Sequence, residues 1–242
     1  MKRLMALSTA EARQYFRNTL LVFCTPMPIF LALIMVMVDS GRIGVVLASS
    51  ALVLTAIGFV VYYSALSMAT TRRDEKVLKR LRTGEARDWE ILTAFSVPLA
   101  IIVLLMVPVG VLMVNLIATD DVPYLINPGY MLTAVVLGIP CTHGLALLTS
   151  RFTQNAEAAM VTSFPVLILL MFSFRGGIRD LLPDALRTFI EHTPFALVAD
   201  LFTHGWIGDT LAQPGRALAS LSAWAVVLIY AGYRSMRWDT HR

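Results

Sequence analysis

Charge is scarce in this 242-residue sequence. Only 15% of its residues are Asp, Glu, Lys or Arg, whereas 57% are hydrophobic and the mean hydropathy is +0.70. A soluble domain carries roughly a quarter charged residues, so the composition excludes an ordinary soluble domain and also a disordered chain. Cysteine is scarce too, and because Cys24 and Cys141 both lie in apolar runs, a disulfide scaffold is excluded as well. The sequence therefore predicts an integral membrane protein.

Two further absences limit the chemistry. The phosphate-binding pattern Gly-x-x-x-x-Gly-Lys-[Ser/Thr] does not occur, so we expect the chain to bind no ATP by that motif and to hold no cofactor of its own. The 20 basic and 16 acidic residues all fall outside the apolar stretches described next. Proton- and sodium-driven transporters place carboxylates or broken polar helices near the bilayer midplane. Secondary transport is therefore disfavoured.

Six apolar stretches approach or exceed the roughly 17 to 25 residues that cross a bilayer as a helix. They predict an all-α integral membrane protein, with residues 1–242 forming one transmembrane domain. The first stretch is as long as a span and has no small-residue cleavage site, so we expect it to stay in the membrane. The six predicted spans are 19–38, 43–71, 91–118, 130–149, 158–174 and 217–233.

The basic residues are distributed unevenly between these spans. The N-terminal segment carries four, the second loop seven, the fourth loop one and the C-terminal tail three, which is 15 of the 20. Cytoplasmic loops are enriched in Lys and Arg. The pattern therefore predicts a multi-pass protein with both termini and the second loop in the cytoplasm, and gives no reason to expect nucleic-acid binding.

The second loop, residues 72–90, has a helical pattern of its own. Val77, Leu78 and Leu81 recur at helical spacing among seven basic and five acidic residues, and Thr83 and Gly84 then break the pattern. Such a stripe fits either a helix lying on lipid headgroups or a rigid knob for a cytoplasmic partner. The residues alone leave these two interpretations equal.

The segment 175–216 is too long for an idle connection. Its apolar spacing predicts two short amphipathic helices, broken at residues 192–194. Thr193 is expected to cap the helix that begins at Pro194, as an Asn at the same position also would. This pair of helices either dips into the outer leaflet or lies flat on it. His192 and His204 in the same segment have no convincing third ligand, so no metal site is predicted.

Three short segments together carry a family resemblance. The first is the loop itself, with Arg-Arg-Asp-Glu-Lys-Val-Leu-Lys-Arg-Leu-Arg-Thr-Gly at 72–84 and Arg-Asp-Trp-Glu-Ile-Leu at 87–92. The second is Glu-Ala-Arg-Gln-Tyr-Phe-Arg-Asn at 11–18, and the third is Gly-Gly-Ile-Arg-Asp-Leu-Leu-Pro at 176–183 followed by Thr-Pro-Phe at 193–195. Together they resemble ABC transporter permeases of the type-2 export class, in which the second segment is similar to the amphipathic N-terminal helix and the third to the outer segment.

The resemblance implies a cytoplasmic N-terminal amphipathic helix, a coupling helix within 72–90 and a re-entrant outer hairpin within 175–216. It also implies ATP-driven export in a bacterial inner membrane, with ATP and Mg²⁺ used by a separately encoded ATPase. The second half of the permease would be another copy or a related chain, surrounded by lipid. The expected ATPase-coupling residues are Leu78, Leu81, Arg82, Glu85, Arg87, Asp88 and Trp89, and the expected path residues are Ser50, Thr55, Thr162, Met171 and Phe174.

A path of apolar, hydroxyl and Met side chains suits hydrophobic or amphiphilic cargo such as a drug, an antibiotic or a lipid. Two other functions remain open. The chain is alternatively a membrane scaffold without transport, or an intramembrane enzyme acting on lipid. The enzyme would need His143 and Cys141, but their spacing on a helix points the side chains to different faces. We expect Pro140 to bend that helix and His143 to be hydrogen-bonded to a neighbour.

Overall fold

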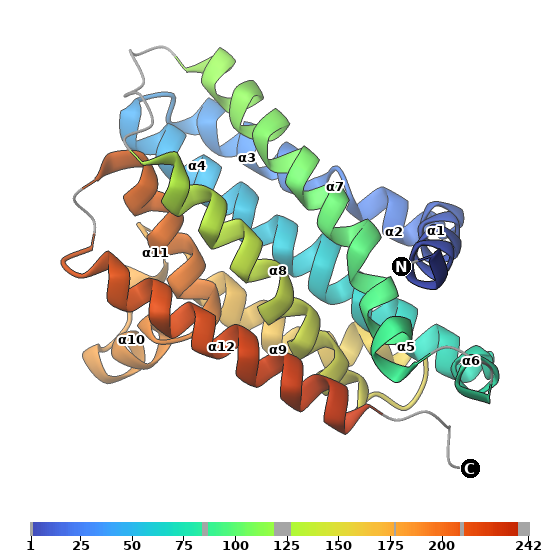
Figure 1. The fold of residues 1–242 in the computed structure, drawn as a ribbon. Coiled ribbons are helices and arrows are strands. Elements are labelled where there is room, and N and C mark those ends of the chain that lie inside the picture. Colours follow the sequence, from blue (N-terminus) through green and yellow to red (C-terminus); the bar gives the residue numbers. More distant parts are fainter. Residues whose placement is uncertain (1, 84–86, 119–126, 177, 209–210, 237–242) are drawn as a thin grey trace.

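The computed structural model describes residues 2–83, 87–118, 127–176, 178–208 and 211–236. They form a bundle of long helices with shorter helices packed at its ends (Figure 1). In chain order the elements are α1 (Lys2–Arg17), α2 (Thr19–Cys24), α3 (Met27–Val38), α4 (Arg42–Thr55), the π-helix η1 (Ala56–Tyr63), α5 (Ser64–Asp74), α6 (Val77–Thr83), α7 (Asp88–Ile117), α8 (Pro128–Ser150), α9 (Ala158–Phe172), the 3-10 helix η2 (Ile178–Leu181), α10 (Asp184–Glu191), α11 (Pro194–Ile207) and α12 (Pro214–Ser235).

Five helical stretches in the described residues are long and apolar enough to cross a membrane, and each overlaps a predicted span. They are Thr19–Val38, Arg42–Asp74, Asp88–Ile117, Pro128–Ser150 and Pro214–Ser235. The remaining predicted span, 158–174, corresponds to α9, which has 15 residues. At 1.5 Å per residue α9 is about 22 Å long, shorter than the hydrocarbon core of about 30 Å. A sixth span thus stays a prediction.

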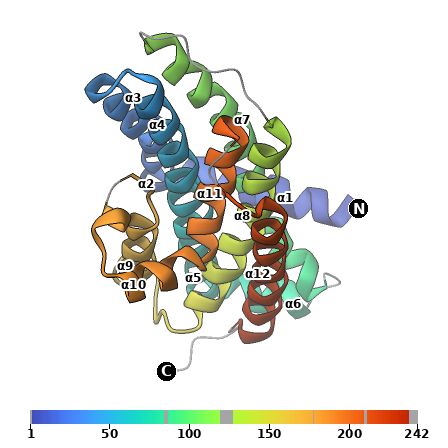
Figure 2. The ribbon, with the colours of Figure 1, turned by 90° about the vertical axis from the view of Figure 1, so that its left-hand side faces the viewer.

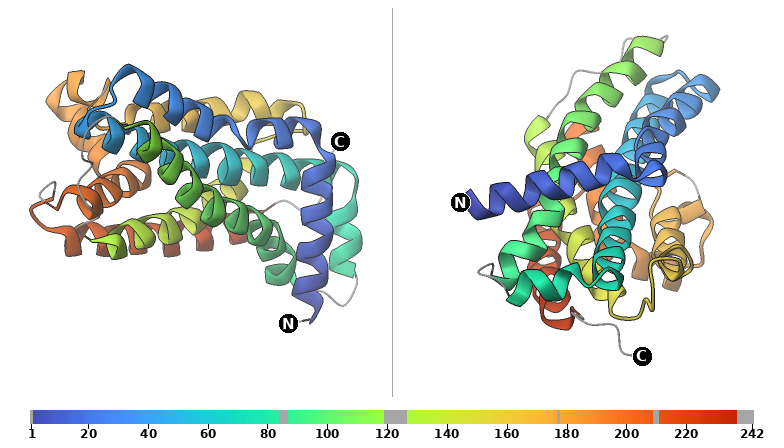
Figure 3. Two further views of the ribbon diagram at one scale, coloured as in Figure 1. Left: turned by 90° about the horizontal axis from the view of Figure 1, so that it is seen from above. Right: turned by 90° about the vertical axis from the view of Figure 1, so that its right-hand side faces the viewer.

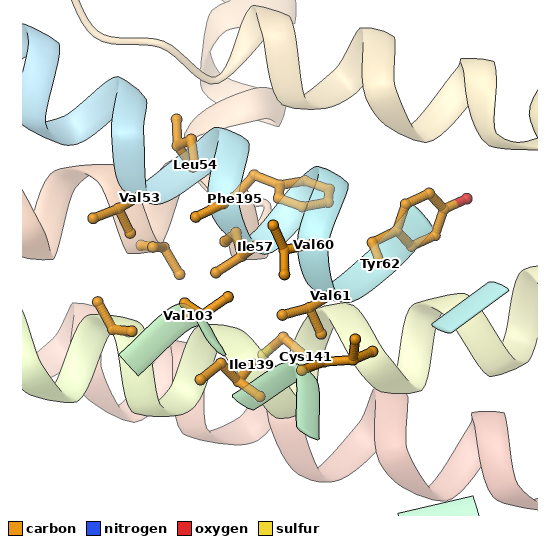
Figure 4. Close-up of a cluster of buried hydrophobic side chains, with 14 of the residues drawn as sticks. Val53, Leu54, Ile57, Val60, Val61, Tyr62, Val103, Ile139, Cys141 and Phe195 are labelled. Carbon is orange, nitrogen blue, oxygen red and sulfur yellow. The ribbon is translucent and has the colours of Figure 1, made fainter. Parts of the chain in front are cut away.

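The second span is the centre of the bundle. Its helices α4, η1 and α5 are continuous, and 83% of its most apolar window is buried, more than in any of the other four. Figure 4 shows its side chains Ile57, Val60 and Val61 facing Val103 of α7 and Ile139 of α8. The core therefore forms around span 2.

The middle of span 2 is an eight-residue π-helix, η1. Such wide turns are rare and often occur at functional positions. Ser64 donates a hydrogen bond across five residues to the carbonyl of Phe59 (3.1 Å). Gly58 lies within η1, and the Cδ1 atom of Leu170 occupies the space that a Cβ at Gly58 would fill. The glycine thus lets α9 approach span 2 closely.

Glycine also brings α8 and α12 together. A Cβ on Gly144 would lie 2.5 Å from the carbonyl carbon and oxygen of Leu228, and a Cβ on Gly232 would meet the carbonyl oxygen of Gly144. Small residues permit such backbone approach between membrane helices. Gly144, next to His143, therefore allows α8 and α12 to pack closely.

The segment 175–216 contributes a buried helix and an exposed one. Helix α11 packs against α4, α8 and α12, and Figure 2 shows it in the middle of the bundle, whereas α10 lies at the side near α9. All residues from Pro194 to Trp206 are buried. The side chain of Thr193 accepts from the amide of Ala196 (3.5 Å) and caps α11, as predicted for the break at 192–194. Helix α11 is therefore part of the core.

Two helices lie at the end of the bundle opposite this segment. Helix α1 crosses the bundle axis there, with α6 beside it (Figure 3). Helix α1 packs on α7 and α2, and α6 packs on α5 and α7. The N-terminal amphipathic helix and the helix of the second loop thus occupy the same end of the molecule.

Candidate functional site: the α5–α6 corner and the helices above it

The α5–α6 corner turns on one residue in an unusual conformation. Lys76 has a φ of 57°, in the left-handed region, where residues with a Cβ are uncommon. Its amide donates to the carbonyl of Arg73 (3.0 Å), and α6 begins at the next residue, Val77. This corner sets the direction of α6 relative to span 2.

The apolar stripe of α6 faces the bundle. Leu78 is fully buried and Leu81 is half-buried against the core. Leu78 therefore packs α6 against the rest of the chain in this structure, and its role in ATPase contact stays a prediction. Arg87 and Asp88 are exposed, and Trp89 is 48% exposed. Glu85 lies outside the described residues, and the Arg82 side chain is likewise not described.

Helix α7 begins directly after this exposed group. The side chain of Glu90 accepts from the backbone amide of Arg87 (2.9 Å), which closes the first turn in the manner of a capping box. Residues 88–90 of the second loop are therefore the first turn of α7 itself. Because that turn is anchored, the indole of Trp89 is presented from a rigid element.

Helix α1 is attached to the same corner by a buried acid. Glu11 is 4% exposed and forms an ion pair with Arg72 at the end of α5 (3.1 Å). Burial raises the pKa of Glu11 above its usual range, although the charge and hydrogen bond of Arg72 oppose this. Nearby, the hydroxyl groups of Tyr15 and Thr25 are hydrogen-bonded (2.6 Å). These contacts fix α1 against the end of α5 and the end of α2.

The predicted path residues lie on span 2 and α9 but do not form one cluster. Ser50 and Thr55 are buried in α4, and the Thr55 hydroxyl donates back to the carbonyl of Ala51 (2.7 Å). Thr162 lies in the first turns of α9, whereas the half-buried Met171 lies at its far end and the half-buried Phe174 lies two residues beyond it. The two helices meet at Gly58 and Leu170. In this structure the five residues thus mark two facing helices.

A charged cluster within the segment 175–216 was not singled out from the sequence. Arg179 donates to both carboxylate oxygens of Asp200 (2.8 and 2.9 Å), and each side chain is 6% exposed. Arg175 also approaches Asp200 (3.4 Å), and Glu191 lies 3.4 Å from Arg179. Asp200 is the only acidic residue of α11. An acid within this mainly apolar helix was the sequence signal that could have predicted a buried ion pair.

The Cys141–His143 pair does not form. The thiol of Cys141 points to the carbonyl of Leu221 (3.7 Å), whereas the ring of His143 lies edge-on to Tyr233, 6.3 Å between centroids. The His143 ring has an interaction with the backbone of Leu92 in α7, but neither ring nitrogen makes a hydrogen bond of good geometry among the described residues. Throughout the residues that the structure describes, no group of three or more His, Cys, Asp and Glu side chains could hold a metal ion.

These features define a multi-pass helical membrane protein with two short helices at one end of the bundle and a buried hairpin helix at the other. The family model described as ABC-2 family transporter protein matches residues 25–234, which is most of the chain. The chain therefore belongs to the ABC-2 transporter family, as the three segments together predicted. A comparison with curated proteins finds no match.

Proposed function

We propose that the chain is the transmembrane permease half of an ATP-driven exporter that moves a hydrophobic or amphiphilic substrate out of the cytoplasm or inner leaflet. The energy would come from ATP and Mg²⁺ bound by separate ATPase subunits, since the sequence has no phosphate-binding loop. The membership in the ABC-2 family is the observation that carries this proposal. A second copy or a related permease would complete the transporter in a bacterial inner membrane, with both termini in the cytoplasm.

The ATPase would dock on the exposed part of the coupling region. Arg87, Asp88 and Trp89 lie on the anchored first turn of α7, next to α6. Large aromatic side chains dominate binding energy at protein interfaces, and charged neighbours set the register. Leu81 supports α6 from its half-buried position. ATP-driven movement of the ATPase would displace this corner and shift the bundle between two states.

Substrate movement would involve the facing surfaces of span 2 and α9. Thr162, Met171 and Phe174 are only half-buried within one chain, which leaves part of α9 for a partner chain or cargo. Methionine and aromatic side chains adapt to varied apolar shapes. The outer hairpin of α10 and α11 would then lie at the exit as a re-entrant element.

A binding measurement on the Trp89→Ala variant tests this proposal. Because an interface Trp usually contributes more than about 1 kcal/mol, the affinity for the ATPase encoded with this chain should fall about tenfold or more. Leu181→Ala removes a side chain that is 85% exposed in the outer segment and should leave the affinity unchanged. The measurement is surface-based binding of ATPase to the chain in nanodiscs. Equal affinities for the two variants would contradict docking at this turn.

A further inference from the structure

Arg73, in the last turn of α5, is a buried arginine that contacts a distant part of the chain. It is 2% exposed. Its guanidinium donates to the carbonyls of Ser150 (2.9 Å), Thr153 (2.6 Å) and Gln154 (3.2 Å). Ser150 is the last residue of α8, and the other two carbonyls belong to the α8–α9 connection. One side chain thus joins span 2 to the inner end of α8.

This arrangement suits an arginine for two physical reasons. The last carbonyls of a helix have no partner within the helix and carry its negative partial charge, so a cation at that end is favourable. The guanidinium offers a planar set of donors that reaches several acceptors at once, whereas an ammonium group is a point charge on a flexible stem. Burial of Arg73 means that water is not there to replace these bonds.

The next residue holds the same connection from another direction. The carboxylate of Asp74 accepts from the amide of Ala156 (2.8 Å). Two consecutive residues of α5 therefore form hydrogen bonds with three carbonyl oxygens and one amide of the segment 150–156. Such paired contacts fix the orientation of the segment as well as its position.

We call the hydrogen bonds of Arg73 and Asp74 to the segment 150–156 the clamp. Further contacts extend from the clamp toward both α9 and α6. Toward α9, the hydroxyl of Thr153 is hydrogen-bonded to that of Thr162 (2.8 Å), one of the predicted path residues. Toward α6, only Glu75 and the left-handed Lys76 separate Asp74 from Val77. An unbroken series of packed and hydrogen-bonded groups thus leads from the coupling helix to α9.

We propose that Arg73 is a positioning residue for energy coupling. By holding the segment 150–156 to α5, it makes the α5–α6 corner and the start of α9 move as one body, so that displacement of α6 reaches α9. This role rests on the proposed ATP-driven function. Arg72 is its natural control, because it has the same side chain at the same helix end but is bonded to Glu11 of α1.

The first experiment uses the full chain alone in nanodiscs and measures hydrogen–deuterium exchange in the peptide 151–158. Arg73→Gln and Arg73→Lys should each speed exchange there about tenfold, since charged hydrogen bonds that hold the segment are lost or weakened. The variants Arg72→Gln and Arg72→Lys should leave this peptide unchanged and speed exchange in α1. The lysine variants keep the charge, so they serve if a glutamine variant does not fold.

The second experiment adds the ATPase subunits and a fluorescent label at Met160→Cys, in a background with Cys24→Ser and Cys141→Ser. Met160 is exposed in the first turns of α9. In otherwise wild-type and Arg72→Lys complexes, quenching of the label should change between the ATP-bound and nucleotide-free states. In Arg73→Lys complexes the change should fall at least about fivefold while ATP hydrolysis continues, as expected for a lost mechanical connection.

Each result has a distinct meaning. If the labelled wild-type complex does not form, or shows no nucleotide-dependent change, the ATP-driven function fails and the positioning role fails with it, whatever the exchange data show. If that complex responds and Arg73→Lys responds equally, the positioning role alone is overturned. Equal exchange of peptide 151–158 in the Arg72 and Arg73 variants would show that the clamp itself does not hold the segment.

Discussion

The buried pair of Arg179 and Asp200 in the outer segment offers a sharp test of what holds α11 in the bundle. The perturbation is a cycle of three variants: Arg179→Met, Asp200→Asn and the double variant. Methionine keeps most of the length of the arginine without its charge, and asparagine keeps the shape of the aspartate. The cycle separates the pair interaction from the loss of packing.

The structure sets the expected magnitude. Both side chains are 6% exposed and are joined by two hydrogen bonds of 2.8 and 2.9 Å. Removing one partner of a buried pair costs about 3–5 kcal/mol, because the other charge is left buried. After Arg179→Met, Arg175 remains 3.4 Å from Asp200 but is 36% exposed, so we expect the lower end, about 3 kcal/mol. The double variant should cost less than about 2 kcal/mol, since no buried charge stays unpaired.

The assay is reversible unfolding in mixed micelles, followed by tryptophan fluorescence, with hydrogen–deuterium exchange of α11 as the local readout. Arg187→Met is a control, because its bond to Glu191 (3.1 Å) joins two half-exposed side chains and should contribute less than about 1 kcal/mol. The reasoning is refuted if Arg179→Met is no more destabilising than Arg187→Met, or if the double variant is as damaging as the sum of the single ones.

Two further predictions concern packing and pH. Gly144→Ala should destabilise the chain by about 1–3 kcal/mol in the same unfolding assay, because the added Cβ meets the Leu228 backbone and α8 must move away from α12. Gly129→Ala is the control, because there is open space around Gly129. Equal stabilities of the two variants would exclude the close contact. Burial raises the pKa of Glu11 above its ordinary value of 4.5. Relative to the Glu11→Gln variant, docking of α1 should therefore be strongest below pH 4.5 and weaken as the pH rises through the raised pKa. Docking is measured by hydrogen exchange, corrected for the intrinsic pH dependence of the exchange rate. Docking that strengthens over this window would mean that the ion pair with Arg72 outweighs burial.

Much of the fold follows from local properties of the sequence. Long apolar runs require helices in a bilayer because every backbone group must be bonded within the segment, and five of the predicted spans overlap apolar helices of sufficient length. The break at Thr193 and Pro194 and the helical stripe at Leu78 and Leu81 are equally local signals, and helices α11 and α6 lie where these signals place them. The three short segments, taken together, were also enough to indicate the family.

The directions of helix faces and the long-range partners were decided only by the tertiary structure. The stripe of α6 predicts an apolar face but not its target, and Leu78 faces the bundle because α5 and α7 lie next to it. The partners of Arg73 are 77 to 81 residues away, so no spacing rule connects them. Helix formation depends on neighbours within a few residues, whereas these contacts depend on how closely whole helices approach, which is set here by glycines such as Gly58 and Gly144.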